Sequence, residues 1–227
     1  MTLVLLPGLD GTGHLFQAFI AALGPQVRTV VVCYPPDQAL DYTGLEAIAR
    51  TFLPANEPYH LLAESFSGPI GISIAASAPP GLRGLILSCT FARNPLPWLA
   101  FARPLIGLAP IRSLPMAVLS HFLLGRFDTT TQCAALKQAL GGVSPRALRA
   151  RAKAALSANV SADLEKVHVP ILYLRASEDK LIPAACARLI SSLAPAAKIE
   201  TIQAPHFLLQ TAPSAAIAAI MAWTKAG

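Results

Sequence analysis

Residues 57–77 read EPYHLLAESFSGPIGISIAAS, and this stretch decides the fold that the sequence predicts. A short apolar strand ends at a sharp turn around Ser65, and a helix rich in small residues follows. A serine at such a turn presents its hydroxyl beyond the end of a sheet, next to the unpaired N–H groups of the helix N-terminus. The turn needs small side chains two positions to either side, where Ala63 and Ser67 replace the glycines of the G-x-S-x-G pattern. The competing interpretation is a serine that caps the helix.

Strands and helices alternate on both sides of this stretch. Such a rhythm is typical of βαβ units, so we expect a mostly parallel sheet of six strands with helices on both faces. The run at 27–33 is nearly continuous and predicts a strand buried on both faces. The expected strands are residues 2–6, 27–33, 59–63, 82–89, 171–174 and 198–202, and the expected helices are 14–23, 42–53, 184–193 and 212–223.

The alternation stops between the fourth and fifth strands, over approximately residues 92–167. Prolines are frequent at its start and no strand-like run appears, so we expect a helical cap inserted into a single domain of residues 1–227. Its apolar part, 98–124, is interrupted by Arg103, Arg112 and prolines, which excludes one uninterrupted bilayer-spanning helix. We expect this part to roof an apolar pocket, with a position at a membrane interface as the alternative.

The composition is that of a globular protein, with 54% hydrophobic and 13% charged residues. The net charge of +6 is concentrated between Arg93 and Lys166, where ten bases face three acids. This basic segment favours an anionic substrate, an acidic acyl carrier protein or an anionic surface, and a solvated helical face is the alternative. Nucleic acid is not expected, because the basic residues are not interleaved with aromatic ones.

The four cysteines are widely spaced and suggest neither a zinc site nor a disulfide framework. Two of them, Cys33 and Cys89, end apparent core strands, so reduced, buried thiols are expected. The chain begins almost directly in a strand, without the pattern of a secretory leader, and we therefore expect a cytoplasmic protein.

Two late loops supply the partners that a reactive serine needs. A serine hydroxyl becomes a nucleophile when a histidine takes its proton and a carboxylate orients that histidine. Asp179 follows the fifth expected strand and His206 the sixth, which completes a Ser65, Asp179, His206 order at one sheet edge. Glu178 is the alternative acid.

The other histidines are weaker candidates for the base. They lie at a helix start, within a strand, in the cap and just before a strand; they are His14, His60, His121 and His168. Glu64 allows two interpretations, because its carboxylate either is solvated on the turn or faces the site and repels anionic substrates.

The glycine-rich loop after the first strand is placed to stabilise an oxyanion. It reads LPGLDG at residues 6–11, and the backbone N–H groups of Leu9 and Phe66 are the expected donors. With this loop, the serine turn and the Ser-Asp-His order, the chain resembles the α/β-hydrolase fold superfamily. The resemblance covers nearly the whole chain and departs from the superfamily at Pro7, in the place of its usual histidine, and at the two elbow positions.

Within the superfamily, the compact sheet and the cap resemble carboxylesterases and carrier-protein methyl ester esterases. The resemblance implies a serine hydrolase that cleaves a carboxylic ester with an apolar acyl chain through an acyl-enzyme, and it implies neither a metal nor an organic cofactor. A thioesterase or acyltransferase with the same triad is the nearest alternative. A non-catalytic protein that binds a small ligand in the same pocket is a third interpretation.

Overall fold

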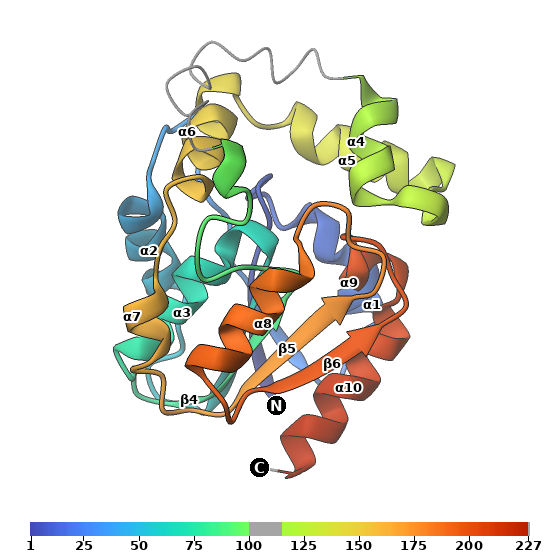
Figure 1. Ribbon diagram of the computed structural model, residues 1–227. Helices are drawn as coiled ribbons and strands as arrows, with labels where there is room; N and C mark the ends of the chain where they lie inside the picture. The colour runs from blue at the N-terminus through green and yellow to red at the C-terminus, as the bar shows by residue number, and fades with distance from the viewer. Residues whose placement is uncertain (100–114, 227) are drawn as a thin grey trace.

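Six parallel strands form the sheet around which the chain folds (Figure 1). The structure is a computed structural model, and it describes residues 1–99 and 115–226. The order across the sheet is β2-β1-β3-β4-β5-β6, and each neighbouring pair is parallel, which confirms the predicted architecture. The strands are β1 (Thr2–Leu6), β2 (Arg28–Val31), β3 (Tyr59–Glu64), β4 (Leu82–Ser88), β5 (Ile171–Ala176) and β6 (Lys198–Ile202).

Helices cover both faces of the sheet because alternate strand residues point to opposite sides. Val4 and Leu61 belong to the apolar core on one face, and Leu5 and Leu62 belong to the core on the other. The first face is covered by α2 (Tyr42–Thr51), α3 (Gly68–Ala76) and α8 (Ala184–Leu193), and the second by α1 (Gln17–Leu23), α9 (Leu208–Thr211) and α10 (Pro213–Ala226).

The second strand differs from its prediction. β2 is shorter than the apolar run at 27–33 and lies at the edge of the sheet, where its side chains are partly exposed. The apolar run therefore predicted the strand correctly, but the prediction that this strand is buried on both faces is wrong. Burial on both faces depends on whether a strand is central in the sheet, and the order of the strands decides this. Cys33, just after β2, is exposed, whereas Cys89, just after β4, is buried as expected, and all four cysteines are free.

The segment between β4 and β5, called the inserted segment below, contains no strand in its described residues. Figure 1 shows α4, α5 and α6 above the sheet, on the side where the strands end. The predicted roof over 98–124 falls largely on residues 100–114, outside the described residues, and the cap at 92–167 stays a prediction. The helices of the inserted segment are α4 (Met116–Leu123), α5 (Thr130–Gly141), α6 (Pro145–Ala155) and α7 (Ser161–Leu164).

The two ends of the inserted segment lie side by side. Arg93 and Asn159 form an isolated antiparallel bridge, and the amide of Asn94 donates a hydrogen bond to the carbonyl of Ala158 over 2.8 Å. The part of the inserted segment that carries α4, α5 and α6 thus leaves and rejoins the sheet domain through a short neck of paired backbone, and α7 follows this neck.

The surface of the inserted segment has fewer unpaired positive charges than its sequence suggests, because some of its bases are buried or paired with acids. Arg151 is fully buried, Arg126 pairs with Glu178 at 2.6 Å, and Lys166 pairs with Asp163 at 3.1 Å. Among residues 1–99 and 115–226, no helix is both long and apolar enough to cross a membrane.

Candidate active site

Ser65 occupies the predicted turn between β3 and α3. Its φ of 49° is in the left-handed region that side chains rarely adopt, so the surrounding contacts must hold it there. The hydroxyl of Thr90 donates a hydrogen bond to the carbonyl of Ser65. A Cβ on Gly68 would overlap the side chain of Thr90, which explains why the small residue behind the turn is a glycine.

The two elbow positions that lack glycine are also explained. Ala63 and Ser67 are fully buried, and a Cβ on Gly71 would come within 2.7 Å of the Cβ of Ala63. The hydroxyl of Ser67 donates to the carbonyl of Pro7 and contacts the hydroxyl of Tyr34 at 2.9 Å. Ser67 therefore connects the turn to the LPGLDG loop, a contact that a glycine would not make.

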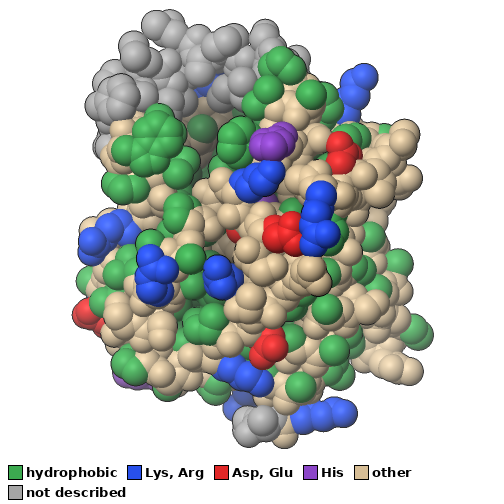
Figure 2. All heavy atoms as spheres, turned by 45° about the vertical axis from the view of Figure 1, so that its right-hand side comes forward, with side chains coloured by type: hydrophobic (Ala, Val, Ile, Leu, Met, Phe, Trp, Pro, Cys, Tyr) green, Lys and Arg blue, Asp and Glu red, His purple; other side chains and the backbone are tan. Residues whose placement is uncertain are grey.

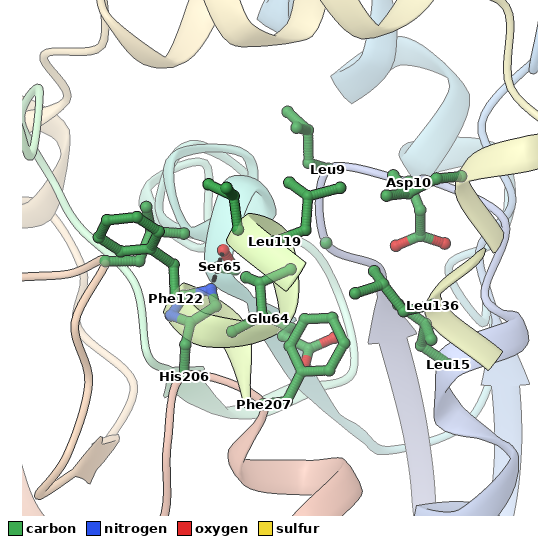
Figure 3. A pocket seen from close by; sticks show the side chains of 15 residues that line it. Leu9, Asp10, Leu15, Glu64, Ser65, Leu119, Phe122, Leu136, His206 and Phe207 are labelled. Atoms are coloured by element: carbon green, nitrogen blue, oxygen red, sulfur yellow. Dashed lines mark hydrogen bonds between the residues drawn. The ribbon is translucent and has the colours of Figure 1, made fainter. Parts of the chain in front are cut away.

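The structure brings Ser65, His206 and Asp179 together in one chain of hydrogen bonds, and Figure 3 shows the Ser65–His206 contact. The Oγ of Ser65 lies 2.8 Å from Nε2 of His206, and Nδ1 of His206 lies 2.9 Å from Oδ2 of Asp179. The other carboxylate oxygen, Oδ1, accepts hydrogen bonds from the amides of Leu181 and Ile182, each at 2.8 Å. Both oxygens of Asp179 are therefore occupied, which fixes the carboxylate against the imidazole.

Burial opposes the charge of Asp179, but its partners outweigh that effect. The positive charge and hydrogen bond of His206, together with the two amides, hold the pKa of Asp179 below its ordinary value. Asp179 is thus ionised at neutral pH and accepts a hydrogen bond from Nδ1–H of His206, which leaves Nε2 free to accept the proton of Ser65.

Glu178 and the remaining histidines lie in other surroundings. Glu178 is paired with Arg126 through two hydrogen bonds of 2.8 and 2.6 Å, so the alternative acid is directed away from His206. His121 contacts Lys180 at 3.2 Å, and His60 packs edge-on against Trp223. Neither His121 nor His14 is among the residues that line the pocket at Ser65.

A pocket of about 390 Å³ opens beside Ser65 and His206. Its wall is mostly leucine and phenylalanine, contributed by the LPGLDG loop, α4, α5 and the loop before α9; Figure 3 shows Leu9, Leu15, Leu119, Phe122, Leu136 and Phe207 around the site. Val118 and Phe122 are 42% and 45% exposed, so they form the rim of the pocket. Figure 2 shows hydrophobic side chains gathered over the upper part of this face.

The LPGLDG loop is held by a buried arginine from the inserted segment. Nη1 of Arg151, on α6, donates to the carbonyls of Leu9 and Asp10 at 3.0 and 2.6 Å, and Nη2 donates to Pro35 at 2.9 Å. The guanidinium also lies 5.7 Å from the centre of the Tyr34 ring. Leu9 lines the pocket next to Ser65, and Phe66 follows Ser65 in the turn.

Two further carboxyl groups line the same pocket. Glu64 is 5% exposed and Asp10 is 3% exposed, so the interpretation of Glu64 as a solvated turn residue is wrong. Oε1 of Glu64 accepts a hydrogen bond of 2.9 Å from the side chain of Gln210. Burial raises the pKa of Glu64 to about 7; the charge of Asp10 adds to this rise, while Gln210 and His206 oppose it.

The model of the alpha/beta hydrolase family matches residues 3–220, which is nearly the whole chain. The chain belongs to the alpha/beta hydrolase family. The predicted family and fold are thereby confirmed.

Individual relatives of this hydrolase are distant. It is 24% identical over 248 residues to a protein of Caulobacter sp. (strain K31) named "Putative carbamate hydrolase RutD", covering 97% of this chain and 89% of the relative. An enol-lactonase from Burkholderia xenovorans LB400 superimposes with a TM-score of 0.84 at 16% identity, covering 99% of this chain and 91% of that one. An esterase from Exiguobacterium antarcticum has a TM-score of 0.84 at 14% identity, with 99% and 92% covered. These structures share the hydrolase fold.

Two residues at the site of this hydrolase were missed from sequence, and a third, Glu64, was left with two interpretations, of which burial in the pocket is correct. Arg151 was counted as one of the bases of the cap, and Tyr34 carried no signal, because both act through contacts with segments far away in the chain. Glu64 did carry a signal: it continues the strand by one residue, and strand alternation places it on the face of Leu62, toward α9.

The free energy of unfolding of the hydrolase is expected to fall less with rising pH when Glu64 is replaced with glutamine. The pKa of about 7 in the folded chain exceeds the ordinary 4.5, so the unfolded chain releases this proton first. The free energy of unfolding therefore falls as the pH rises from 4.5 to above 7, by up to about 3 kcal/mol from this group. Urea unfolding at about pH 5 and about pH 8 is expected to show a smaller fall for Glu64→Gln than for the native chain. Equal falls in the two proteins would contradict the raised pKa.

Proposed function

We propose that this chain is a serine hydrolase that cleaves a carboxylic ester through an acyl-enzyme intermediate. The observation that carries the proposal is the continuous set of hydrogen bonds from Ser65 through His206 to Asp179, at the side of an apolar pocket. A single hydrogen-bonded serine has many structural explanations. A serine in a strained turn, with its Oγ on an imidazole that a buried carboxylate orients, fits nucleophilic catalysis.

In the proposed reaction, Oγ of Ser65 attacks the ester carbonyl while Nε2 of His206 takes its proton. The negative charge that develops on the carbonyl oxygen is received by the N–H groups of Leu9 and Phe66. His206, now protonated, is stabilised by Asp179 and gives its proton to the leaving alkoxide, so that the C–O bond breaks and an acyl-serine remains. Water, deprotonated by the same imidazole, then releases the acid and restores Ser65.

The character of the pocket supports an apolar acyl group. Leucine and phenylalanine side chains make up most of its wall, so a hydrocarbon chain would exclude water there without losing hydrogen bonds. The acidic carrier protein is not part of the proposal, because Arg151 is buried and Arg126 and Lys166 are paired with acids. The named activities of the relatives, on a carbamate and on an enol-lactone, are also acyl-group cleavages and belong in the test.

The proposal is tested by turnover together with covalent labelling. We expect p-nitrophenyl esters with medium-length acyl chains to be hydrolysed with a higher kcat/KM than acetate, and a fluorophosphonate probe to label Ser65, as located by mass spectrometry. An acyl-CoA, a carbamate and a lactone series measured in parallel distinguishes the related acyl cleavages. A folded chain, by circular dichroism, that is neither labelled nor active on any of these substrates would exclude the serine hydrolase mechanism.

A further inference from the structure

Glu64 is a polar group in the pocket that the catalytic steps above do not use. It directly precedes Ser65, it is almost fully buried, and its side chain lies among the residues that line the pocket (Figure 3). Asp10 lies close to it across Gly8: a Cβ on this glycine would be 3.9 Å from Oε2 of Glu64 and 3.6 Å from Oδ1 of Asp10. An otherwise apolar pocket therefore contains two carboxyl groups near the nucleophile.

The partners of Glu64 leave one of its oxygens available to a ligand. Oε1 accepts the hydrogen bond from Gln210 of α9, whereas Oε2 accepts none from any described residue. Glu64 takes no part in the ion pairs between described residues. The nearest buried cation, Arg151, is directed at backbone carbonyls instead. Among residues 1–99 and 115–226, no cation forms an ion pair with Oε2 of Glu64.

The two titratable groups that face Glu64 act on its carboxyl in opposite directions. Asp10, in the loop after β1, raises the pKa of Glu64, and His206, in the loop before α9, lowers it. The Oδ2 of Asp10 accepts hydrogen bonds from the amide and hydroxyl of Thr12, at 2.9 and 2.6 Å. Oδ1 of Asp10 accepts no hydrogen bond from a described residue.

We propose that Glu64 determines substrate specificity: with Asp10 behind it, its carboxyl selects esters that carry a cationic group and rejects esters that carry a carboxylate. This inference rests on the proposed ester hydrolysis and names its substrate class. A cation placed beside Oε2 gains an attraction that is only weakly screened in a buried pocket. A carboxylate in the same position meets the like charge of Glu64.

The selectivity depends on pH. Above a pH of about 7 Glu64 is ionised and attracts the cation, and below it the carboxyl is neutral and the preference weakens. A bound cation favours the ionised carboxylate and so extends the preference to lower pH.

The test compares substrates that differ in charge but not in shape. One is the p-nitrophenyl ester of γ-trimethylammonio-butyrate, and its isostere has a tert-butyl group in place of the trimethylammonium group. The third is the p-nitrophenyl monoester of adipate, which ends in a carboxylate. Because the cation is quaternary, its charge does not change with pH. The values of kcat/KM are measured from about pH 6 to about pH 9 for the native chain and for Glu64→Gln.

Two further variants make the comparison specific. Asp10→Asn tests the second carboxyl, and Glu57→Gln is the matched control. Glu57 precedes β3 at the opposite end of the strand, where it forms an exposed ion pair with Arg28 at 2.6 Å. The Glu57→Gln substitution changes the net charge by the same amount as Glu64→Gln, at a residue that does not line the pocket.

We expect the native chain above pH 7 to prefer the cationic ester to its isostere by roughly tenfold or more, and the adipate monoester to be the poorest substrate. In Glu64→Gln the preference is expected to approach one and to lose its pH dependence, in Asp10→Asn it is expected to fall partly, and in Glu57→Gln it is expected to match the native value. A native preference near one, or a preference that Glu64→Gln leaves unchanged, overturns the inference. A variant that slows all three esters by the same factor also overturns it, because that result assigns Glu64 to the support of His206.

The inference and the proposed function fail in different ways. Hydrolysis of the tert-butyl ester supports the proposed function whatever the charge preference is. If no ester is hydrolysed, the proposed function fails, and the preference for the cationic chain is then measured by ligand binding. The methyl ketones with the same two chains are then titrated calorimetrically against the native chain and Glu64→Gln, and equal dissociation constants for both ketones in the native chain overturn the inference.

Discussion

Replacing Ser65 with alanine is expected to lower kcat for p-nitrophenyl esters by about five to six orders of magnitude while KM changes little. The reason is geometric: Oγ of Ser65, at 2.8 Å from Nε2 of His206, is the atom that forms the acyl bond in the proposed mechanism. His206→Ala is expected to lose a similar amount, since the hydroxyl then has no base. Asp179→Asn is expected to lose about four orders of magnitude, because the amide stabilises the wrong tautomer of the imidazole.

The matched control is Ser192→Ala, an exposed serine on α8 whose hydroxyl bonds to its own helix, and its activity is expected to equal that of the native chain. The kcat of all four variants is obtained from initial rates at a saturating ester concentration, and circular dichroism verifies their fold. If Ser65→Ala keeps most of the native kcat while folded, the assignment of the nucleophile is wrong.

Replacing Arg151 with methionine is expected to lower both stability and turnover. The substitution keeps most of the side-chain volume but leaves the carbonyls of Leu9, Asp10 and Pro35 without their buried donor. Unsatisfied buried carbonyls cost about 1–3 kcal/mol each, and removal of the desolvated charge offsets part of this, so we expect a loss of about 2–4 kcal/mol. Urea unfolding measures this change.

The effect of Arg151→Met on turnover follows from the position of Leu9. If its amide moves by as much as 1 Å, kcat is expected to fall by about 10²-fold, with a smaller change in KM. Arg146→Met is the matched control, since it makes the same substitution at an exposed position of α6. Native kcat in a folded Arg151→Met variant would show that Arg151 does not position the loop.

The strands, the helices and the places of Ser65, Asp179 and His206 after strands were readable from the sequence because they depend on local patterns. The expected range of β6 was correct to the residue, and Ser65, Asp179 and His206 each follow a parallel strand, so their meeting at one edge is a consequence of topology. The exposure of β2 was not readable, because it depends on where that strand stands in the sheet. The contact of Arg151 with the LPGLDG loop was not readable either, since it joins residues about 140 positions apart, and no pattern in either segment indicates the other.

The paired neck at Arg93 and Asn159 has a consequence for how such a protein could be recombined. A segment that leaves and returns at one point can in principle be exchanged as a cassette, with two joints and no change to the sheet. This segment, however, includes Arg151, whose guanidinium donates hydrogen bonds to three backbone carbonyls outside the segment. An inserted segment without an arginine at this position would leave those carbonyls unpaired. The inserted segment and the LPGLDG loop therefore depend on each other, and a successful chimera has to transfer them together.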